Sequence, residues 1–155
     1  MTTGDFTSVA LLTHENDSAL DVITKEVAQA IGEKASSLAA ERAYPVTISI
    51  RLDGAEIFRQ ALPGADSEQI SWIERKANVV SLTHHSTMYE RVLAEESGTD
   101  WHKDHGVEDA THAIHGGGFP LKTKSGEFKG ILLISGLPQV QDHLFAVEVL
   151  SYFSH

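Results

Sequence analysis

His115-Gly116-Gly117-Gly118-Phe119-Pro120 leads into an apolar run at residues 129–136, and Leu137-Pro138-Gln139 and Asp142-His143 follow that run. Three successive glycines have no Cβ, so the backbone there can adopt φ > 0 or approach another surface closely. The proline after them has a fixed φ and no N–H, which is typical of an edge strand or of the first residue of a strand. Because no lysine follows as in a nucleotide loop, a tight start of a strand is favoured over a cradle for an anion.

The C-terminal third of the chain therefore predicts a hairpin followed by a helix. We predict strands at residues 117–123 and 127–135, joined by a turn at Ser125-Gly126. The final helix is predicted over residues 139–153, with an apolar stripe of Leu144, Val147 and Leu150. Residues 98–114 have no periodic pattern and predict a loop, with room for one helical turn after Gly106.

The N-terminal part of the chain predicts a long helix. A short apolar run at residues 9–12 is either a strand or the lead into that helix, and Asn16 or Asp17 is its expected N-cap. The helix ends before Pro45, because a proline disfavours the α region for the preceding residue. Its apolar face is formed by Leu20, Ile23, Val27, Ile31 and Leu38.

A β-hairpin is predicted directly after this helix. Residues 46–52 alternate strictly between apolar and polar side chains, which predicts a strand with one buried face. Asp53-Gly54 is a strong signal for a two-residue hairpin loop. That loop places Arg51 opposite Glu56 and Ile50 opposite Ile57, which pairs opposite charges on one face and aliphatic side chains on the other. We predict this register, with the second strand ending before Pro63-Gly64.

Two further helices are predicted between the two hairpins. The first begins at Asp66 with Gln69 as its capping-box partner, and its buried stripe consists of Ile70, Ile73, Ala77 and Val80. The second covers residues 86–96, with Met88, Val92 and Leu93 facing inward. Four residues lie partly off the stripe of the first of these helices, namely Trp72, Arg75, Lys76 and Asn78. They form either a solvated face with Trp72 in a seam, or the lining of a pocket or a subunit contact.

The order of these elements predicts an α+β fold with an antiparallel sheet and helices packed against it. The 155 residues, 41% hydrophobic and 22% charged, fit a single domain over residues 1–155. A net charge of −10 disfavours a nucleic-acid partner, because phosphate binding requires a basic surface. There is no cysteine, signal-peptide pattern or bilayer-spanning run, so we expect a cytoplasmic protein without a membrane partner.

Several motifs resemble the haem-degrading-domain superfamily, which includes GlcG, HbpS-like proteins and the C-terminal domains of PduO-type proteins. They are Gly117-Gly118-Phe119-Pro120, Ser135-Gly136-Leu137-Pro138-Gln139 and Asp142-His143, together with the helix that carries Trp72, Arg75, Lys76 and Asn78. The pattern is most similar to an uncharacterised subfamily with GG-x-FP and SGLPQ-x-x-DH motifs. The resemblance covers most of the chain and implies a profilin-like sheet of four or five strands. It also implies haem as a cofactor, with His115 and His143 as candidate axial ligands.

Nine histidines raise the question of a metal site. His102 and His105, and likewise His112 and His115, are three residues apart, and on a helix each pair could present two imidazoles to one ion. Because no HExxH motif is present and such spacing is common in a histidine-rich segment, we predict no metal site and keep these four residues as weak candidates.

The adjacent residues Asp142 and His143 are the strongest candidates for a chemical role. An aspartate in the first turn of a helix accepts backbone N–H bonds, which explains Asp142 without catalysis. His143 beside that helix end is expected to have a lowered pKa and to be neutral, able to accept a proton or to ligate iron. Adjacent residues on a helix point about 100° apart, so a triad of Ser135, His143 and Asp142 is not expected. A structural role is favoured for both residues. If the site is catalytic, His143 is the weak candidate for the catalytic residue.

A ligand pocket is expected where the glycine stretch, the turn after the apolar run and the Trp72 helix meet. Its candidate ligand-binding residues are His115, Gly117, Gly118, Phe119, Pro120, Trp72, Arg75, Lys76, Ser135, Gly136, Asp142 and His143. We predict a homo-oligomeric small-molecule or haem-binding module, with Trp72 and Trp101 as exposed aromatics that mark the subunit interface. The alternatives are an enzyme that uses His143 as acid/base while Arg75 or Lys76 holds a carboxylate, and a non-catalytic interaction or scaffold protein.

Overall fold

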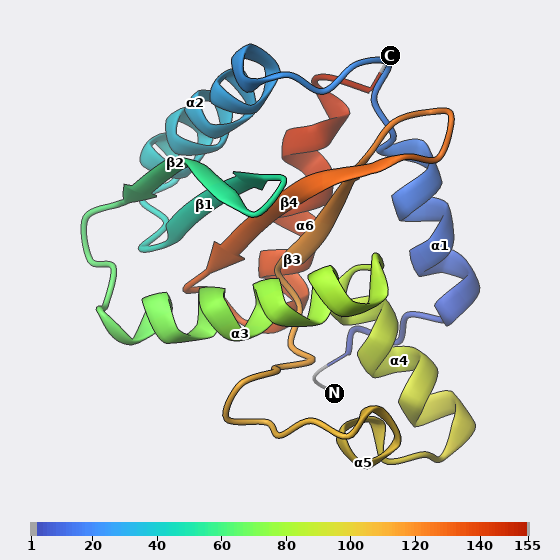
Figure 1. The fold of residues 1–155 in the computed structure, drawn as a ribbon. Coiled ribbons are helices and arrows are strands. Elements are labelled where there is room, and N and C mark those ends of the chain that lie inside the picture. The colour runs from blue at the N-terminus through green and yellow to red at the C-terminus, as the bar shows by residue number, and fades with distance from the viewer. Residues whose placement is uncertain (1–2, 155) are drawn as a thin grey trace.

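The structure, a computed structural model, describes residues 3–154. Its elements are α1 (Ser8–Asp17), α2 (Lys25–Glu41), β1 (Thr47–Leu52), β2 (Ala55–Ala61), α3 (Glu68–Thr83), α4 (Thr87–Ser97), α5 (Trp101–His105), β3 (Gly118–Lys122), β4 (Phe128–Ser135) and α6 (Gln139–Ser151). The four strands form one antiparallel sheet in the order β2-β1-β4-β3 (Figure 1). The predicted α+β class is confirmed, and the sheet has four strands.

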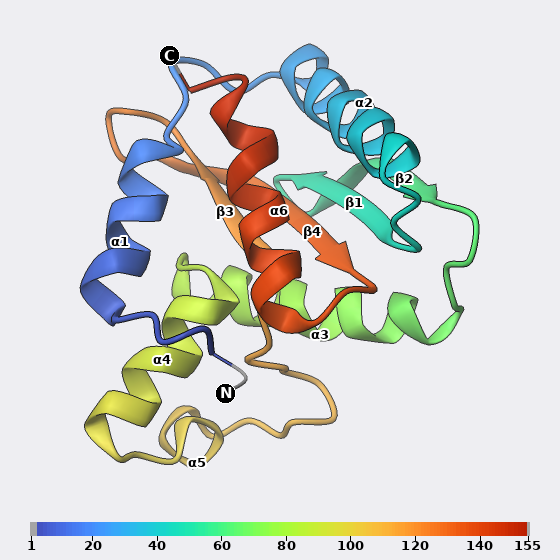
Figure 2. The same ribbon diagram turned by 180° about the vertical axis from the view of Figure 1, so that it is seen from behind.

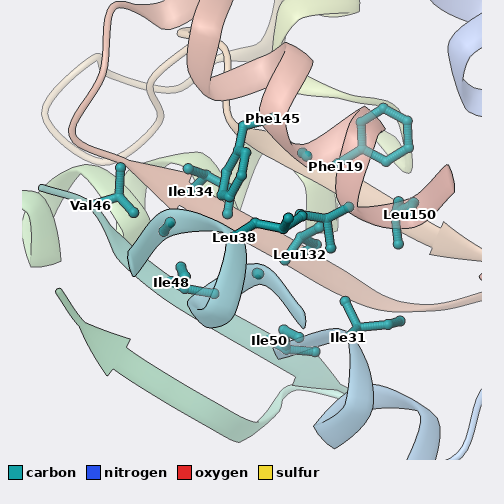
Figure 3. Close-up of a cluster of buried hydrophobic side chains, with 14 of the residues drawn as sticks. Ile31, Leu38, Val46, Ile48, Ile50, Phe119, Leu132, Ile134, Phe145 and Leu150 are labelled. Atoms are coloured by element: carbon teal, nitrogen blue, oxygen red, sulfur yellow. The ribbon is translucent and has the colours of Figure 1, made fainter. Parts of the chain in front are cut away.

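Helices cover both faces of the sheet. Helices α2 and α6 pack on one face, where α2 contacts β1 and β2, and α6 contacts β3 and β4 (Figure 2). Helix α3 lies on the other face and contacts β3 and β4. The largest hydrophobic cluster lies between the sheet and the pair α2 and α6, and its side chains include Ile31, Leu38, Ile48, Ile50, Phe119, Leu132, Ile134, Phe145 and Leu150 (Figure 3). A smaller cluster joins Ile73, Ala77 and Val80 of α3 to Ile131 and Leu133 of β4.

The predicted long helix begins later than expected, as α2, and the run at residues 9–12 belongs to a separate helix, α1. Asn16 and Asp17 do not cap a helix but end α1, and the second helix begins after Thr24, whose hydroxyl accepts a hydrogen bond from the Val27 N–H at 3.1 Å. Between them Leu20 is extended and pairs with Thr123 beside β3, and its N–H donates to the Lys122 carbonyl at 2.9 Å. The prediction was wrong because Leu20 is buried against the sheet, so its apolar character did not indicate a helical face.

The first hairpin has the predicted loop but not the whole predicted register. Arg51 lies opposite Glu56 as predicted, whereas Ile50 lies opposite Phe58 and not Ile57. A β-bulge inserts one extra residue into β2 at this point. Without it Phe58 would oppose Ser49 on the polar face; with it Phe58 packs against the main core, where it meets Gly32 of α2.

Helix α3 begins two residues later than predicted, and Gln69 does not form a capping box. The Asp66 carboxylate accepts a hydrogen bond from the Glu68 N–H at 2.8 Å. The Gln69 side chain instead accepts from the Thr47 hydroxyl at 2.8 Å and donates to the Pro45 carbonyl at 3.0 Å. Gln69 therefore ties the start of α3 to the start of β1.

Several predicted burial patterns are corrected by the tertiary packing. Ile70 is 42% exposed, Leu93 37% and Leu144 43%, so these three residues do not belong to the buried stripes of their helices. In α6 the buried face consists of Asp142, His143, Phe145, Ala146, Val149 and Leu150. The predicted loop at residues 98–114 contains the short helix α5 before Gly106 rather than after it.

Trp101 is not an exposed aromatic as predicted. It is 4% exposed, packs with Val79 and Ala94, and donates from Nε1 to the Glu90 carboxylate at 2.9 Å. The pairing satisfies the indole N–H of a buried tryptophan. None of the helices in residues 3–154 is both long enough and apolar enough to cross a bilayer.

Candidate functional site

A cleft of about 360 Å³ is lined by His115 just before the three glycines, by the turn after β4 with the start of α6, and by the first half of α3. It lies where the pocket was predicted from the sequence. Its lining residues are Asp66, Glu68, Gln69, Trp72, Lys76, His115, Ser135, Gly136, Leu137, Gln139 and Asp142. Most of these side chains are polar, so the cleft suits a ligand that forms several hydrogen bonds.

A buried ion pair between α3 and α6 lies at the inner end of the cleft. Lys76 and Asp142 are each only 2% exposed, and their Nζ and Oδ2 atoms are 3.4 Å apart. Lys76 Nζ also donates to the Ile134 carbonyl at 3.0 Å, while Asp142 Oδ1 accepts from the Leu137 N–H at 3.0 Å. Asp142 accepts a backbone N–H bond as predicted, but it holds the turn that precedes α6 and does not cap the first turn of the helix.

Burial disfavours the charged form of both partners. It raises the pKa of Asp142 to about 6, although the Lys76 ammonium and the backbone N–H groups of the turn oppose this shift. Burial likewise lowers the pKa of Lys76, against the opposing effect of the Asp142 carboxylate. Near neutral pH the pair can therefore exchange a proton more readily than an exposed lysine and aspartate can.

Gly117 makes the close approach of these elements possible. Its φ is +127°, which is favourable only for glycine, and its carbonyl accepts a hydrogen bond from the Ile134 N–H at 2.9 Å. A Cβ at this position would overlap the Ile134 carbonyl oxygen and would lie 2.8 Å from Lys76 Nζ. The N–H groups of the flanking Gly116 and Gly118 donate to the Gln139 and Thr87 side chains, so the glycine stretch packs tightly and these two N–H groups are not directed at a ligand.

Trp72 and His115 form the aromatic side of the cleft. Their rings meet edge to face with centroids 4.8 Å apart, and the Arg75 guanidinium lies over the Trp72 ring at 4.4 Å. Arg75 itself bonds the Asp109 carboxylate at 2.7 Å and is not one of the lining residues. Partial burial, followed by the positive charges of Arg91 and Lys76, lowers the pKa of His115, so its imidazole is neutral.

His143 faces away from the cleft, although it is adjacent to Asp142 in the sequence. Its side chain is fully buried, and its ring contacts Phe6, His14 and Phe119. His143 Nε2 and His14 Nδ1 are 3.0 Å apart and form one hydrogen bond. His143 Nδ1 has no hydrogen-bond partner among the described residues. Its pKa is lowered to about 3 by burial and secondarily by His14; the direction agrees with the prediction, but the helix end is not the cause.

The four histidines of residues 102–115 are not gathered around a common point. His102 Nε2 contacts the His112 carbonyl, His105 Nδ1 contacts the Trp101 carbonyl at 2.7 Å, and His112 Nδ1 contacts its neighbour Thr111. Within residues 3–154 no group of three or more histidine, aspartate or glutamate side chains is arranged to hold a metal ion.

Six of the predicted ligand-binding residues line the cleft: Trp72, Lys76, His115, Ser135, Gly136 and Asp142. The other six do not: Arg75, Gly117, Gly118, Phe119, Pro120 and His143. Five lining residues were missed, namely Asp66, Glu68, Gln69, Leu137 and Gln139. Leu137 and Gln139 belong to the turn motif and could have been included on that ground, whereas the other three follow only from how α3 lies against β1.

The chain is similar to a known protein family and to several solved structures. The model of the family described as haem degrading protein HbpS-like matches residues 23–151. A UPF0303 protein from Acidobacterium capsulatum is 37% identical over 120 residues, which cover 77% of this chain and 73% of the relative. The crystal structure of Ybr137w protein has a TM-score of 0.88 and 26% identity, covering 97% of this chain and 89% of the other.

The structure of a PduOC complex with haem is similar in fold, with a TM-score of 0.68 at 20% identity, covering 86% of this chain and 94% of the other. The family match covers α2 through α6 completely and so includes every residue that lines the cleft. The chain therefore belongs to the HbpS-like haem degrading protein family.

Proposed function

We propose that this protein is a small-molecule-binding module whose ligand occupies the cleft beside His115, and that haem is the ligand to test first. The observation that carries the proposal is a neutral, half-buried imidazole beside an aromatic ring at a cleft of about 360 Å³. Membership of the HbpS-like family supports haem as the ligand class, as does the similar fold of a protein solved in complex with haem.

The donor set at this cleft fits one axial ligand of a haem. His115 is biased toward the neutral form, which is the form that ligates iron, and Trp72 and Leu137 supply apolar surface for a macrocycle. A bound haem would supply an iron centre that accepts the His115 imidazole. His143, the other predicted ligand, has Nε2 occupied by His14 and does not line the cleft, so His115 carries the proposal alone.

Titration with haemin tests this assignment directly. The wild-type protein should give a saturable shift of the Soret band, and His115→Ala should lose it because the iron ligand is removed. His112→Ala is a matched control from the same segment, since His112 does not line the cleft. A featureless linear response of the wild type, or equal binding by the His115→Ala variant, would contradict haem ligation by His115.

The proposal also includes assembly into a homo-oligomer. Trp72 is partly exposed at the cleft, whereas the burial of Trp101 removes it as support for an interface. Light scattering at micromolar protein concentration measures the assembly, and a monomer mass would refute it.

The enzymatic alternative changes its acid/base residue. His143 is separated from the cleft by the body of α6, so an acid/base role at the cleft falls to Asp142, whose pKa of about 6 is suited to proton transfer near neutral pH.

A further inference from the structure

Lys76 differs from the other lysines of the chain in its surroundings. It is 2% exposed and lies at the inner end of the cleft, whereas the remaining six are exposed or half-buried, namely Lys25, Lys34, Lys103, Lys122, Lys124 and Lys129. A lysine in a desolvated site beside an ion partner is the kind of amine that proteins use as a nucleophile.

The hydrogen bonds of Lys76 leave one position of its nitrogen unoccupied. Nζ has two acceptors, the Ile134 carbonyl at 3.0 Å and the Asp142 carboxylate at 3.4 Å. A neutral amine has two N–H donors and one lone pair, so these two acceptors use both donors. Among the described residues no group donates a hydrogen bond to Nζ, and the lone pair of a neutral amine would therefore be unshared.

Lys76 is one of the residues that line the cleft, whereas its other side packs closely against Gly117. Gly117 has no side chain, and a Cβ there would lie 2.8 Å from Nζ. The positive φ of Gly117 makes any larger residue strained at this position. The Gly117 side of the amine is closed, because a Cβ there would also overlap the Ile134 carbonyl oxygen, so a carbonyl compound would approach Nζ from the cleft.

A proton carrier lies next to the amine. The Asp142 carboxyl contacts Nζ directly, and burial raises its pKa to about 6. Burial also lowers the pKa of Lys76 and so increases the neutral fraction of the amine.

We propose that Lys76 is a covalent attachment site that forms a Schiff base with aldehydes or ketones entering the cleft. The Nζ lone pair attacks the carbonyl carbon and forms a C–N bond, while the C=O π electrons move to the oxygen. Asp142 accepts a proton from nitrogen and returns it to that oxygen, giving a carbinolamine. The Asp142 carboxylate then takes up a proton from water and passes it to the hydroxyl group, which departs as one water. The protonated imine nitrogen gives its proton to Asp142, which releases it to solvent. No oxidant or reductant is required.

Reductive trapping tests this proposal on the full chain. Benzaldehyde and sodium cyanoborohydride are added at pH 7, and the modified lysines are identified by peptide mapping and mass spectrometry. We expect Lys76 to be modified at least about tenfold faster than any other lysine, because an ordinary lysine is almost wholly protonated at this pH. Lys76→Met should remove the fast reaction, and the surface control Lys25→Met should retain it. Asp142→Asn should keep the amine but slow its modification, since the proton carrier is lost.

Modification of the exposed lysines while Lys76 of the folded wild type stays unmodified would overturn the proposal. The peptide map of the wild type decides this even where Lys76→Met fails to fold, because the six other lysines are internal references. The inference does not depend on haem binding, which rests on His115. If His115→Ala loses haemin binding while Lys76 is still trapped, haem ligation by His115 is supported and the Schiff-base proposal is unaffected. If Lys76 stays unmodified in a protein that binds haemin, only the Schiff-base proposal is refuted.

Discussion

Replacing His143 with phenylalanine should make the fold more resistant to acid. The His143 ring is fully buried among Phe6, His14 and Phe119, so a phenylalanine can occupy a similar space without a titratable nitrogen. The replacement leaves His14 Nδ1 without its partner, but His14 is only partly buried and can bond water instead. The variant therefore isolates the effect of a buried neutral imidazole on the pH dependence of stability.

The sign of this effect follows from proton linkage. The folded pKa of His143 is about 3, below the value near 6.5 in the unfolded chain, so the unfolded state binds the proton more tightly. The contribution of His143 to stability is fully present above pH 6.5 and is lost as the pH falls from there toward 3. Between pH 7.5 and pH 5 these two pKa values correspond to a loss of about 2 kcal/mol in the wild type.

Asp142 acts in the opposite direction and must be separated from this effect. Its folded pKa of about 6 lies above the unfolded value near 3.8, so protonation stabilises the fold as the pH falls, by about 1 kcal/mol between pH 7.5 and pH 5. Because Asp142 is present in both proteins, its contribution cancels when the pH dependence of the variant is subtracted from that of the wild type.

Urea unfolding at pH 7.5 and pH 5, followed by circular dichroism, provides the free energies of unfolding. The wild type should lose about 2 kcal/mol more than His143→Phe between the two pH values. An NMR titration of the His143 ring in the wild type gives its pKa independently. Equal pH dependence of the two proteins, or a normal ring pKa, would refute the structural role of a buried neutral His143; unchanged haemin binding by the variant would support it.

Gly117→Ala should lower the free energy of unfolding by about 2–3 kcal/mol or prevent folding, because it combines a positive φ with overlap of the Ile134 carbonyl. Gly126→Ala is the control, because Gly126 has a positive φ but no atom within 4 Å of an added Cβ, so this variant measures the backbone strain alone. An equal loss of unfolding free energy at both sites in urea would exclude a packing role for Gly117. Thr24→Ala should cost about 1 kcal/mol in the same assay through loss of the N-cap of α2, and Asp17→Ala should cost much less; the reverse order would restore the helix start predicted from the sequence.

Local sequence signals were sufficient where neighbouring residues alone decide the conformation. Asp53-Gly54 determined a hairpin loop, and α4 (Thr87–Ser97) lies within one residue of the predicted range 86–96. The run after the glycine stretch became β4, and α6 follows it. These features depend on turn preferences, capping and the length of apolar runs, all of which act over a few residues. The motif at residues 135–139 and the Trp72 helix lie at the cleft, whereas the motif at residues 117–120 does not line it.

The register of the first hairpin shows where local signals fail. A strict alternation predicted Ile50 opposite Ile57, but the adjacent pair Ile57-Phe58 breaks that alternation. The bulge places Phe58 against Gly32 of α2. Because this contact is made with another element, the sequence of the hairpin alone does not predict it. The position of Leu20 has the same origin, because its burial depends on β3, which lies about 100 residues later in the sequence.

The sequence by itself determined the α+β class, most of the elements and the segments that meet at the cleft. Only the tertiary structure decided the roles within it: Lys76 and Asp142 are 66 residues apart and become a buried pair, while His143 is directed to His14, 129 residues away. Adjacent residues of a helix project in different directions, so Asp142 and His143 serve different surfaces. The packing of α1 and α3 around α6 decides which surface Asp142 and His143 each contact. No local sequence pattern predicts that packing.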